Sequence, residues 1–467
     1  MRRTMIATSC MLAAVCAGWA PAARGANPMT LKTHEITISG QQIETPILKR
    51  RLYPTESELQ PGNAATILLR LSWEQTAYFS KVAPTLNEWA EKPLTDPAWK
   101  DIESVFSSQF YAEMKRAAYR HDAAWEYPIG EQPLFSISLP DAQDLRRLIG
   151  YGLAARIRYH LSRREFDAAR EGILVGLANA RHCAQTPFLV SQLIASSTIN
   201  RMFDCCDEMI GQPGSPNLYW ALATLPRPML DLRRALELEQ VGLEMSVAGL
   251  ADLDRPRSTT EWRQLRDELL KWIQSSGATR PDEANRTLNP DELAKYTRVA
   301  LPNLTGASPA AVAAMSDDEA FVRWFKAEHR RLAEMATALM RLPAVEALPR
   351  LHDFDHKAVQ ELRAAGVPGN MIDVMVWNAV HVPLVIGSLE RRIDALRIVE
   401  AIRDYMASHE GKLPPNLGDI TAVSLPVDPL TGQPFSWKTS GEFGWLTAEA
   451  VPGDDKVGPV KYELRAR

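Results

Sequence analysis

The feature that most constrains the fold is a series of segments in which apolar residues recur every three or four positions. This is the spacing of one face of an α-helix. Two such stripes meet at the short polar turn Ser162-Arg163-Arg164, which predicts a helical hairpin, and a further helix is expected from Pro187 to Ile210. The two stripes are Leu145, Leu148, Ile149, Leu153, Ile157 and Leu161, followed by Phe166, Ala169, Ile173, Leu177 and Ala180.

Helix signals continue along the chain. Two capping boxes, Ser258-x-x-Glu261 and Ser316-x-x-Glu319, each predict the start of a helix with an apolar stripe. A last helix has a face made of Leu389, Ile393, Leu396, Val399, Ile402 and Met406. Strand-like pieces follow at 434–438, 444–447 and 460–464, and an earlier one lies at 34–39.

The predicted fold class is mainly α, with a helical-hairpin body and a small C-terminal α+β module. The hairpin resembles a tetratricopeptide unit, since Tyr159 and Ala168 have suitable spacing. No 34-residue self-similarity is sustained, so a regular repeat is not expected. We predict four parts for the 467 residues: a signal peptide at 1–25, an extended arm at 26–60, the helical body at 61–385 and the α+β module at 386–467.

The N-terminal segment is typical of a secretory signal peptide. Arg2 and Arg3 precede the uncharged run Met5–Trp19, and Ala23-Arg24-Gly25 predicts cleavage before Ala26. The run is shorter than the roughly 20 residues of a membrane span, so we expect no transmembrane segment in the mature chain. The protein is therefore predicted to be periplasmic or secreted. A twin-arginine signal and lipidation of Cys16 are the alternatives.

Composition limits the partners and the redox chemistry. The net charge of −4 gives no basic excess, so no nucleic-acid partner is expected. Removal of the signal peptide leaves Cys183, Cys205 and Cys206. Neighbouring helical cysteines point about 100° apart, so Cys205 and Cys206 should not bond to each other. We predict buried free thiols, with a redox-active pair or a metal site as the alternative.

The C-terminal 80 residues resemble the C-terminal part of a type II secretion major pseudopilin. The matching residues are Tyr405, Gly411-Lys412-Leu413-Pro414, Leu417, Asp428-Pro429-Leu430-Thr431-Gly432-Gln433-Pro434 and Phe435-Ser436-Trp437. The resemblance implies a calcium-binding loop at Asp454 and Asp455. A pseudopilin, however, begins with its long apolar helix, whereas this helix lies in the last fifth of the chain and carries several arginines. The chain is therefore not expected to be a pilus subunit.

A second resemblance extends along the whole chain. Asn63-Ala64-Ala65, the segment 116–125, the helices at 145–210 and the C-terminal tail are similar to uncharacterised secreted, mostly helical proteins of planctomycete-type bacteria. This resemblance implies a secreted helical protein and implies no activity.

Two groups of residues are candidates for chemistry. His352 and His356 share a helix face and, with Asp353, could hold one metal ion. Asp204 with Asp207 or Glu208 could form an acid pair for general acid–base catalysis. Each group has a plainer interpretation, because charged residues also mark a solvated helix start or the wet side of a helix.

Known nucleophile and phosphate-loop motifs are not found in the sequence. We therefore predict a non-catalytic helical interaction scaffold of the cell envelope, which binds protein partners and needs no cofactor. The alternative is an exported metal-dependent hydrolase whose site is assembled from scattered His, Asp and Glu residues.

Overall fold

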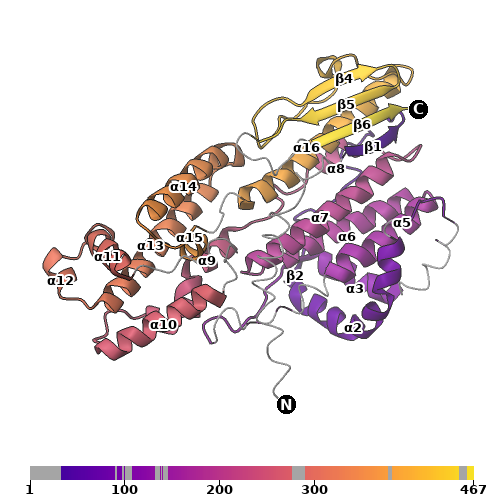
Figure 1. Ribbon diagram of the computed structural model, residues 1–467. Coiled ribbons are helices and arrows are strands. Elements are labelled where there is room, and N and C mark those ends of the chain that lie inside the picture. The colour runs from indigo at the N-terminus through magenta and orange to yellow at the C-terminus, as the bar shows by residue number, and fades with distance from the viewer. Residues whose placement is uncertain are drawn as a thin grey trace. The chain divides into compact units, whose positions relative to one another are not determined.

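The computed structural model describes residues 33–89, 92–96, 99, 108–131, 137, 139, 146–275, 290–376, 381–451 and 460–467. Helices dominate this part of the chain, and a small sheet includes its C-terminal strands (Figure 1). The prediction of a mainly helical protein with some sheet near the C-terminus is confirmed. The predicted signal peptide 1–25, as well as Asp454 and Asp455, lie outside the described residues.

The chain divides into two compact units. Unit 1 is built from Tyr127–Ser138 and Arg233–Pro383, and unit 2 from Pro28–Glu126, Leu139–Leu232 and Leu384–Arg467. The sequence suggested other boundaries, with one helical body at 61–385. By its internal contacts, the stretch 61–385 contributes to both units, while residues 33–60 of the arm and the module 386–467 belong to unit 2.

The helices of unit 2 surround α6 (Phe166–Cys183), which packs against α3 (Ser108–Ala118), α5 (Ala154–Ser162) and α7 (Leu189–Ile210). The predicted stripe of α6 is buried, with Ala169, Ile173 and Leu177 all at 0% exposure, so burial of this face holds the helices together. The remaining helices of unit 2 are α2 (Ala64–Trp89), the π-helix η3 (Arg146–Leu153), α8 (Tyr219–Ala223), the 3₁₀ turn η5 (Leu417–Asp419) and α16 (His381–Ser408).

Two strands that are distant in sequence form a small parallel pair, β2 (Gln60–Asn63) and β3 (Arg120–Asp122). Asn63 anchors this pair and the start of α2. Its side-chain oxygen accepts hydrogen bonds from the backbone N–H groups of Ala65 and Ala124, both at 2.9 Å, and its Nδ2 donates to the Ala124 carbonyl at 2.8 Å. Asn63 thus acts as a helix cap and a strand link at once.

The main sheet of unit 2 joins the two ends of the described chain. Its strand order is β1-β6-β5-β4, made from β1 (Thr33–Ile38), β4 (Ser436–Ser440), β5 (Phe443–Ala448) and β6 (Val460–Ala466). β1 runs parallel to β6, and the other pairs are antiparallel. The N-terminal strand is therefore part of the C-terminal sheet. Gly40 then passes α16 so closely that a Cβ there would lie 2.7 Å from the Ala407 nitrogen.

Helix α16 crosses one face of this sheet (Figure 1). Its predicted apolar face is completely buried: Leu389, Ile393, Leu396, Val399, Ile402 and Met406 are all 0% exposed. Charged residues of the same helix are buried as well. These are Glu390, Arg391, Arg392, Asp394, Glu400 and Arg403. Since burying an unpaired charge is costly, each of these groups requires a partner.

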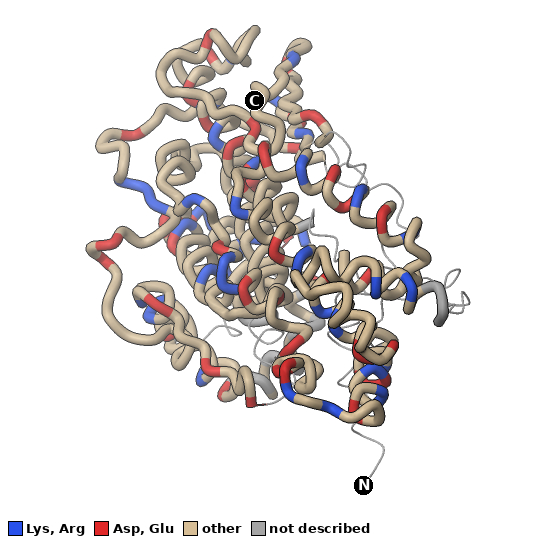
Figure 2. The backbone as a smooth tube through the Cα atoms, turned by 90° about the vertical axis from the view of Figure 1, so that its left-hand side faces the viewer, with Lys and Arg blue, Asp and Glu red and all other residues tan. Residues whose placement is uncertain are grey.

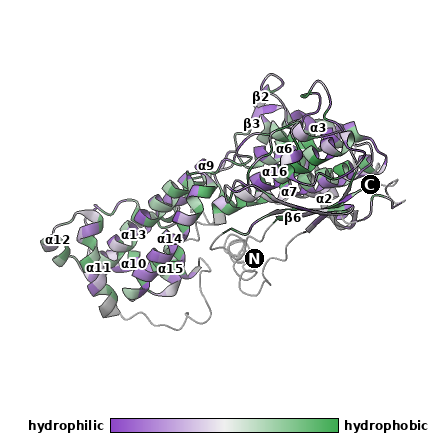
Figure 3. Ribbon diagram, turned by 90° about the horizontal axis from the view of Figure 1, so that it is seen from above, coloured by the Kyte–Doolittle hydropathy of each residue, from purple (hydrophilic) through white to green (hydrophobic). Residues whose placement is uncertain are grey.

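Unit 1 is organised around α13 (Asp317–Met340), which packs on α9 (Arg233–Ser246), α10 (Thr259–Ser275), α11 (Pro290–Thr305) and α14 (Ala344–Ala364). Its shorter helices are η4 (Ala248–Leu250), α12 (Pro309–Ala313) and α15 (Gly369–Met375). Hydrophobic and hydrophilic residues are interspersed along these helices (Figure 3). The buried sides form one apolar core with Trp262, Leu269, Trp324 and Phe325.

The two predicted capping boxes mark real helix starts. At α10, the Ser258 Oγ accepts from the Glu261 N–H at 3.3 Å, and Glu261 accepts from the Ser258 N–H at 2.8 Å. At α13, the Ser316 Oγ accepts from the Glu319 N–H at 3.1 Å. Glu319 turns instead toward Arg323, whose Nε lies 2.9 Å from its carboxylate.

Candidate functional site

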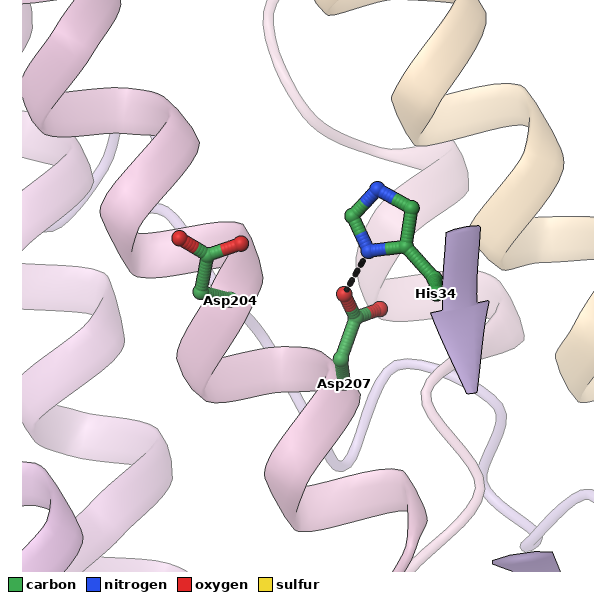
Figure 4. A group of neighbouring side chains, drawn as sticks. All are labelled: His34, Asp204 and Asp207. Atoms are coloured by element: carbon green, nitrogen blue, oxygen red, sulfur yellow. Dashed lines mark hydrogen bonds and ion pairs between the residues drawn. The ribbon is translucent and has the colours of Figure 1, made fainter. Parts of the chain in front are cut away.

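The most concentrated group of potential ligand atoms lies in unit 2, where β1, α7, α16 and β6 meet. The parallel register of β1 and β6 places His34 opposite Tyr462, and their rings stack at 4.7 Å between centroids. Asp204 and Asp207, one turn apart on α7, approach the same point (Figure 4). Ligand atoms of His34, Asp204 and Asp207 all lie within 4.8 Å of one another.

Hydrogen bonds already join these side chains. His34 Nδ1 lies 2.8 Å from Asp207 Oδ2, and the Tyr462 hydroxyl lies 3.4 Å from Asp207 Oδ1. Burial raises the pKa of Tyr462 well above its ordinary value, with a further contribution from the Asp207 charge. Tyr462 therefore remains a neutral hydroxyl that donates to the carboxylate.

Arg392 of α16 completes the group. Its Nη2 donates to Asp204 Oδ1 at 2.6 Å and to Asp207 Oδ2 at 2.9 Å, while its Nη1 donates to the Asn200 carbonyl at 2.9 Å. The side chain is only 8% exposed. Burial opposes its charge, yet the Asp207 and Asp204 carboxylates outweigh burial and raise the pKa of Arg392. The guanidinium thus stays charged and neutralises both acids.

Arg392 changes what the group can do chemically. A metal ion bound by His34, Asp204 and Asp207 would need the carboxylate oxygens that Arg392 contacts, and it would lie beside a buried positive charge. His34 Nδ1 would also have to give up its bond to Asp207. The three residue types suit Zn²⁺ or Mn²⁺, but their arrangement is that of a charge-compensated junction.

The predicted acid pair on α7 is divided between two arginines. Asp204 and Asp207 share Arg392, whereas Glu208 accepts from Arg158 Nε at 2.8 and 2.9 Å. Burial raises the pKa of Glu208, although the Arg158 bond opposes this shift. All three carboxyl groups thus serve as partners of buried arginines.

The cysteines between these acids are buried and free, as predicted. Burial raises the pKa of Cys205 and of Cys206, so both thiols remain protonated at neutral pH. A protonated, buried thiol is a poor nucleophile and a poor metal ligand. Cys183 is buried too.

The predicted metal ligands of α14 are not brought to other ligands by the described part of the chain. Asp353 and His356 are exposed, and His356 Nε2 lies 3.3 Å from Gln360 Nε2, while His352 is half-buried. Among the described residues, the group with metal-ligand proximity is His34, Asp204 and Asp207. A site at His352, Asp353 and His356 therefore stays a prediction, as does calcium at Asp454 and Asp455.

A second feature of unit 2 is an open cleft of about 500 Å³. It is lined by three segments: residues 41–50 of the N-terminal arm, the turn and first residues of α6 at 164–168, and the loop after α7 at 214–216. Arg50 links two of them, because it binds Glu44 from its own segment and Asp167 from α6. Arg164 lies in the turn before α6 and donates to the Pro213 carbonyl at 2.5 Å.

Sequence reasoning singled out Asp204 and Asp207 but missed their partners, and it missed the cleft, for the same reason. His34 and Asp207 are 173 residues apart, and Arg392 and Asp204 are 188 apart. No local spacing marks such a group. A usable signal was the long helix at 381–408, where an apolar face is accompanied by many charges that would have to find buried partners.

Comparison with known proteins adds no relative to this description. No protein-family model, no curated protein and no solved structure matches the chain. Among the described residues, no helix combines the length and the apolar composition that a membrane span requires.

Proposed function

We propose that the protein is an exported, non-catalytic interaction scaffold of the cell envelope. The observation that supports this proposal is Arg392, which occupies the oxygens of the most ligand-like group in the described structure. A catalytic metal centre keeps at least one open coordination position and a set of free donor atoms. Here the donors bind one another and a permanent cation.

The other buried charges of α16 support the same conclusion. Arg391 forms a bidentate pair with Asp428, since its Nε and Nη2 donate to the two carboxylate oxygens at 2.9 and 2.7 Å. Arg403 donates to Glu400 at 2.8 Å. Arg227 binds Asp394 at 2.7 Å and also contacts Glu390. These ionisable groups hold unit 2 together, which is a structural role.

A scaffold needs an accessible concave surface that a partner can enter, and the hairpin of α5 and α6 forms part of one. The turn between these helices lines the open cleft together with the N-terminal arm. We propose that this tetratricopeptide-like hairpin presents the cleft to a protein partner. Helical hairpins bind partner segments in their grooves by the same principle. Basic and acidic residues are interspersed over the described backbone, which suits binding to mixed-charge protein surfaces (Figure 2).

Export is the second part of the proposal. It is supported by the uncharged run Met5–Trp19 and the small residues at Ala23-Arg24-Gly25. Mass spectrometry of the protein isolated from its host is expected to show a mature chain that begins at Ala26. A chain that retains Met1, or one with a lipid on Cys16, would contradict this processing.

The second candidate function is an exported metal-dependent hydrolase, and the proximity of His34, Asp204 and Asp207 is the observation that favours it. Metal analysis distinguishes the two. A scaffold is expected to purify without stoichiometric Zn²⁺ or Mn²⁺ and to bind neither in calorimetric titration. Stoichiometric metal that is lost in the His34→Ala variant would contradict the scaffold and favour the hydrolase.

A direct test of the scaffold places a photo-crosslinking amino acid at Ala168, which lines the cleft. The control position is the exposed Ala364 on α14. In the native host, one discrete protein adduct is expected from position 168 and not from position 364. The same adduct from both positions, or no adduct from position 168, would count against the proposal.

A further inference from the structure

The cleft at the start of α6 is large enough for more than a simple ion. Its volume of about 500 Å³ lies within the range of about 300–1,000 Å³ that is typical of ligand pockets. Phe166 and Pro216 give it apolar walls, and Gln41 adds an amide that can both donate and accept hydrogen bonds. These linings suit a ligand that has peptide groups and side chains as well as a charge.

The negative residues of the lining are already neutralised. Glu44 and Asp167 both bind Arg50. Glu165 accepts from His160 Nδ1 and from Arg163 Nε, each at 2.7 Å. These bonds, with the His160 contact first, lower the pKa of Glu165, which therefore stays ionised and engaged. Because Lys49 also binds Glu44, at 3.0 Å, each of these three acids has a cation beside it.

Arg164 differs from Arg50 in its partners. Its hydrogen bond goes to a neutral carbonyl, that of Pro213, and no carboxylate of the described residues lies within 4 Å of it. Its backbone has a φ of 61°, in the left-handed region that residues with a side chain rarely adopt. Gly214, opposite, has no side chain, and a Cβ there would lie 3.6 Å from Arg164 Nη2. The bonds of the Glu165 N–H to the His160 carbonyl and of the Arg164 N–H to the Leu161 carbonyl, both 2.9 Å, show that this conformation ends helix α5, and it places the Arg164 guanidinium at the cleft.

The chemistry of these donors selects a carboxylate. A guanidinium fork matches the two oxygens of a carboxylate in a bidentate pair. The 18-residue helix α6 begins beside it, but Asp167 in its first turn already compensates the helix dipole, so the pairing rests on Arg164. Arg164 is the lining cation that no carboxylate of the described residues contacts, so it matches one negative charge rather than the two of a phosphate. A singly charged group on a peptide-like body fits best.

We propose that the cleft binds the C-terminal carboxylate of a partner polypeptide, with Arg164 as the residue that pairs with the terminal oxygens. Recognition of a chain end by an arginine and free backbone amides is a known mode of peptide binding. The inference rests on the proposed scaffold function in taking the ligand to be a protein segment. It goes beyond that function by naming the chemical group that is recognised.

The test uses the full mature protein and a randomised pool of fluorescent N-acetylated pentapeptides, made with either a free C-terminal carboxylate or a C-terminal amide. Fluorescence polarisation compares the wild type with Arg164→Gln and Arg164→Lys. The control is Arg330→Gln, which removes the same charge from an exposed position of α13 that does not line the cleft. We expect the free-carboxylate pool to bind at least about tenfold more tightly than the amide pool.

In Arg164→Gln this preference is expected to vanish, whereas Arg164→Lys should retain part of it and Arg330→Gln should keep it within about twofold. Equal binding of the two pools, binding of neither pool, or displacement of the peptides by inorganic phosphate would each overturn the inference. Failure is distinguishable from failure of the scaffold. A crosslink at position 168 without carboxylate preference refutes only this inference, and preference without a crosslink refutes only the scaffold.

Discussion

The interiors of the two units differ in the kinds of residue that they bury. The core of unit 1 is apolar and aromatic, and rings such as Trp324 and Phe325 pack edge to face at 6.2 Å around α13. In unit 2, α16 buries a comparable apolar face, but it also buries charges that bind segments from elsewhere in the chain. The core of unit 1 is stabilised by non-directional burial of apolar surface, and the core of unit 2 is stabilised in addition by specific ion pairs.

The difference has a consequence for specificity. Apolar contacts tolerate substitution when volume is conserved. A buried arginine, by contrast, allows only the arrangement in which its carboxylate is present. Arg391 thereby fixes the position of the Asp428 loop, and Arg392 fixes α7 beside α16. We infer that the buried ion pairs of unit 2 reduce its stability somewhat but allow only one register between distant segments. A single register suits the unit that carries the cleft.

The largest expected effect comes from breaking the most deeply buried pair. Asp428→Ala leaves the Arg391 guanidinium unpaired at 0% exposure and should lower the free energy of unfolding by about 3–5 kcal/mol. The double variant Arg391→Met/Asp428→Ala should recover much of the loss, because no lone charge is then buried. Urea denaturation measures both. Equal losses in the single and double variants would show that the pair does not act through charge.

A similar loss is expected in unit 1, with a different dependence on conditions. Leu269→Ala removes a completely buried side chain from the apolar core and should cost about 2–4 kcal/mol through the lost burial and the remaining cavity. Because no charge is involved, this loss should be the same at pH 7 and pH 5 and at low and high salt. A salt-dependent loss in the urea series would contradict the contrast between the two cores.

The same contrast explains what the sequence could predict. The periodicity of apolar residues is a local property, so it predicted the helices, the buried face of α16 and the capping box at α10. The strand-like pieces were also local, and three of them form β4, β5 and β6. Strand pairing is not local. A strand was expected at 34–39 in the extended arm 26–60, but its partner was not, and β1 pairs with β6 over more than 400 residues of sequence.

The candidate site was harder to predict than the fold for the same physical reason. A carboxylate on a helix looks solvated from its neighbours in sequence, and only tertiary contact shows that Asp207 meets His34, Tyr462 and Arg392. Local spacing therefore drew attention to His352 and His356, which share a helix face. It could not find Arg164, whose significance depends on its φ angle and on the carboxylates around it.

An intermediate effect is expected from two buried histidines, one in each unit. Burial lowers the pKa of His182 and of His329 to about 4, from an ordinary value of 6.5. The unfolded chain therefore binds more protons between pH 6.5 and 4, so stability is complete above pH 6.5 and falls as the pH drops through this window. Each histidine should cost about 2 kcal/mol at pH 5.

Urea midpoints measured from pH 7 to pH 5 test this in each unit. His329→Leu removes the titrating ring of unit 1. The free energy of unfolding that is lost between pH 7 and pH 5 should therefore be about 2 kcal/mol smaller in this variant. Leu332→Met is the matched control, since it alters a buried position one turn away without removing a titrating group. An unchanged pH dependence in His329→Leu would show that the ring is not held in its neutral form.

The smallest expected effect on stability falls at the cleft, where the largest effect on binding is expected. Arg164→Gly removes the side chain from a left-handed residue and so relieves about 1–2 kcal/mol of backbone strain. It also loses the bond to Pro213 and gains entropy in the unfolded chain, which together offset most of this relief. Denaturation should therefore shift by less than about 1 kcal/mol, while preference for free-carboxylate peptides disappears. A loss of much more than about 1 kcal/mol would show that the Arg164 side chain is needed for stability. Unchanged preference for free-carboxylate peptides would contradict its role at the cleft.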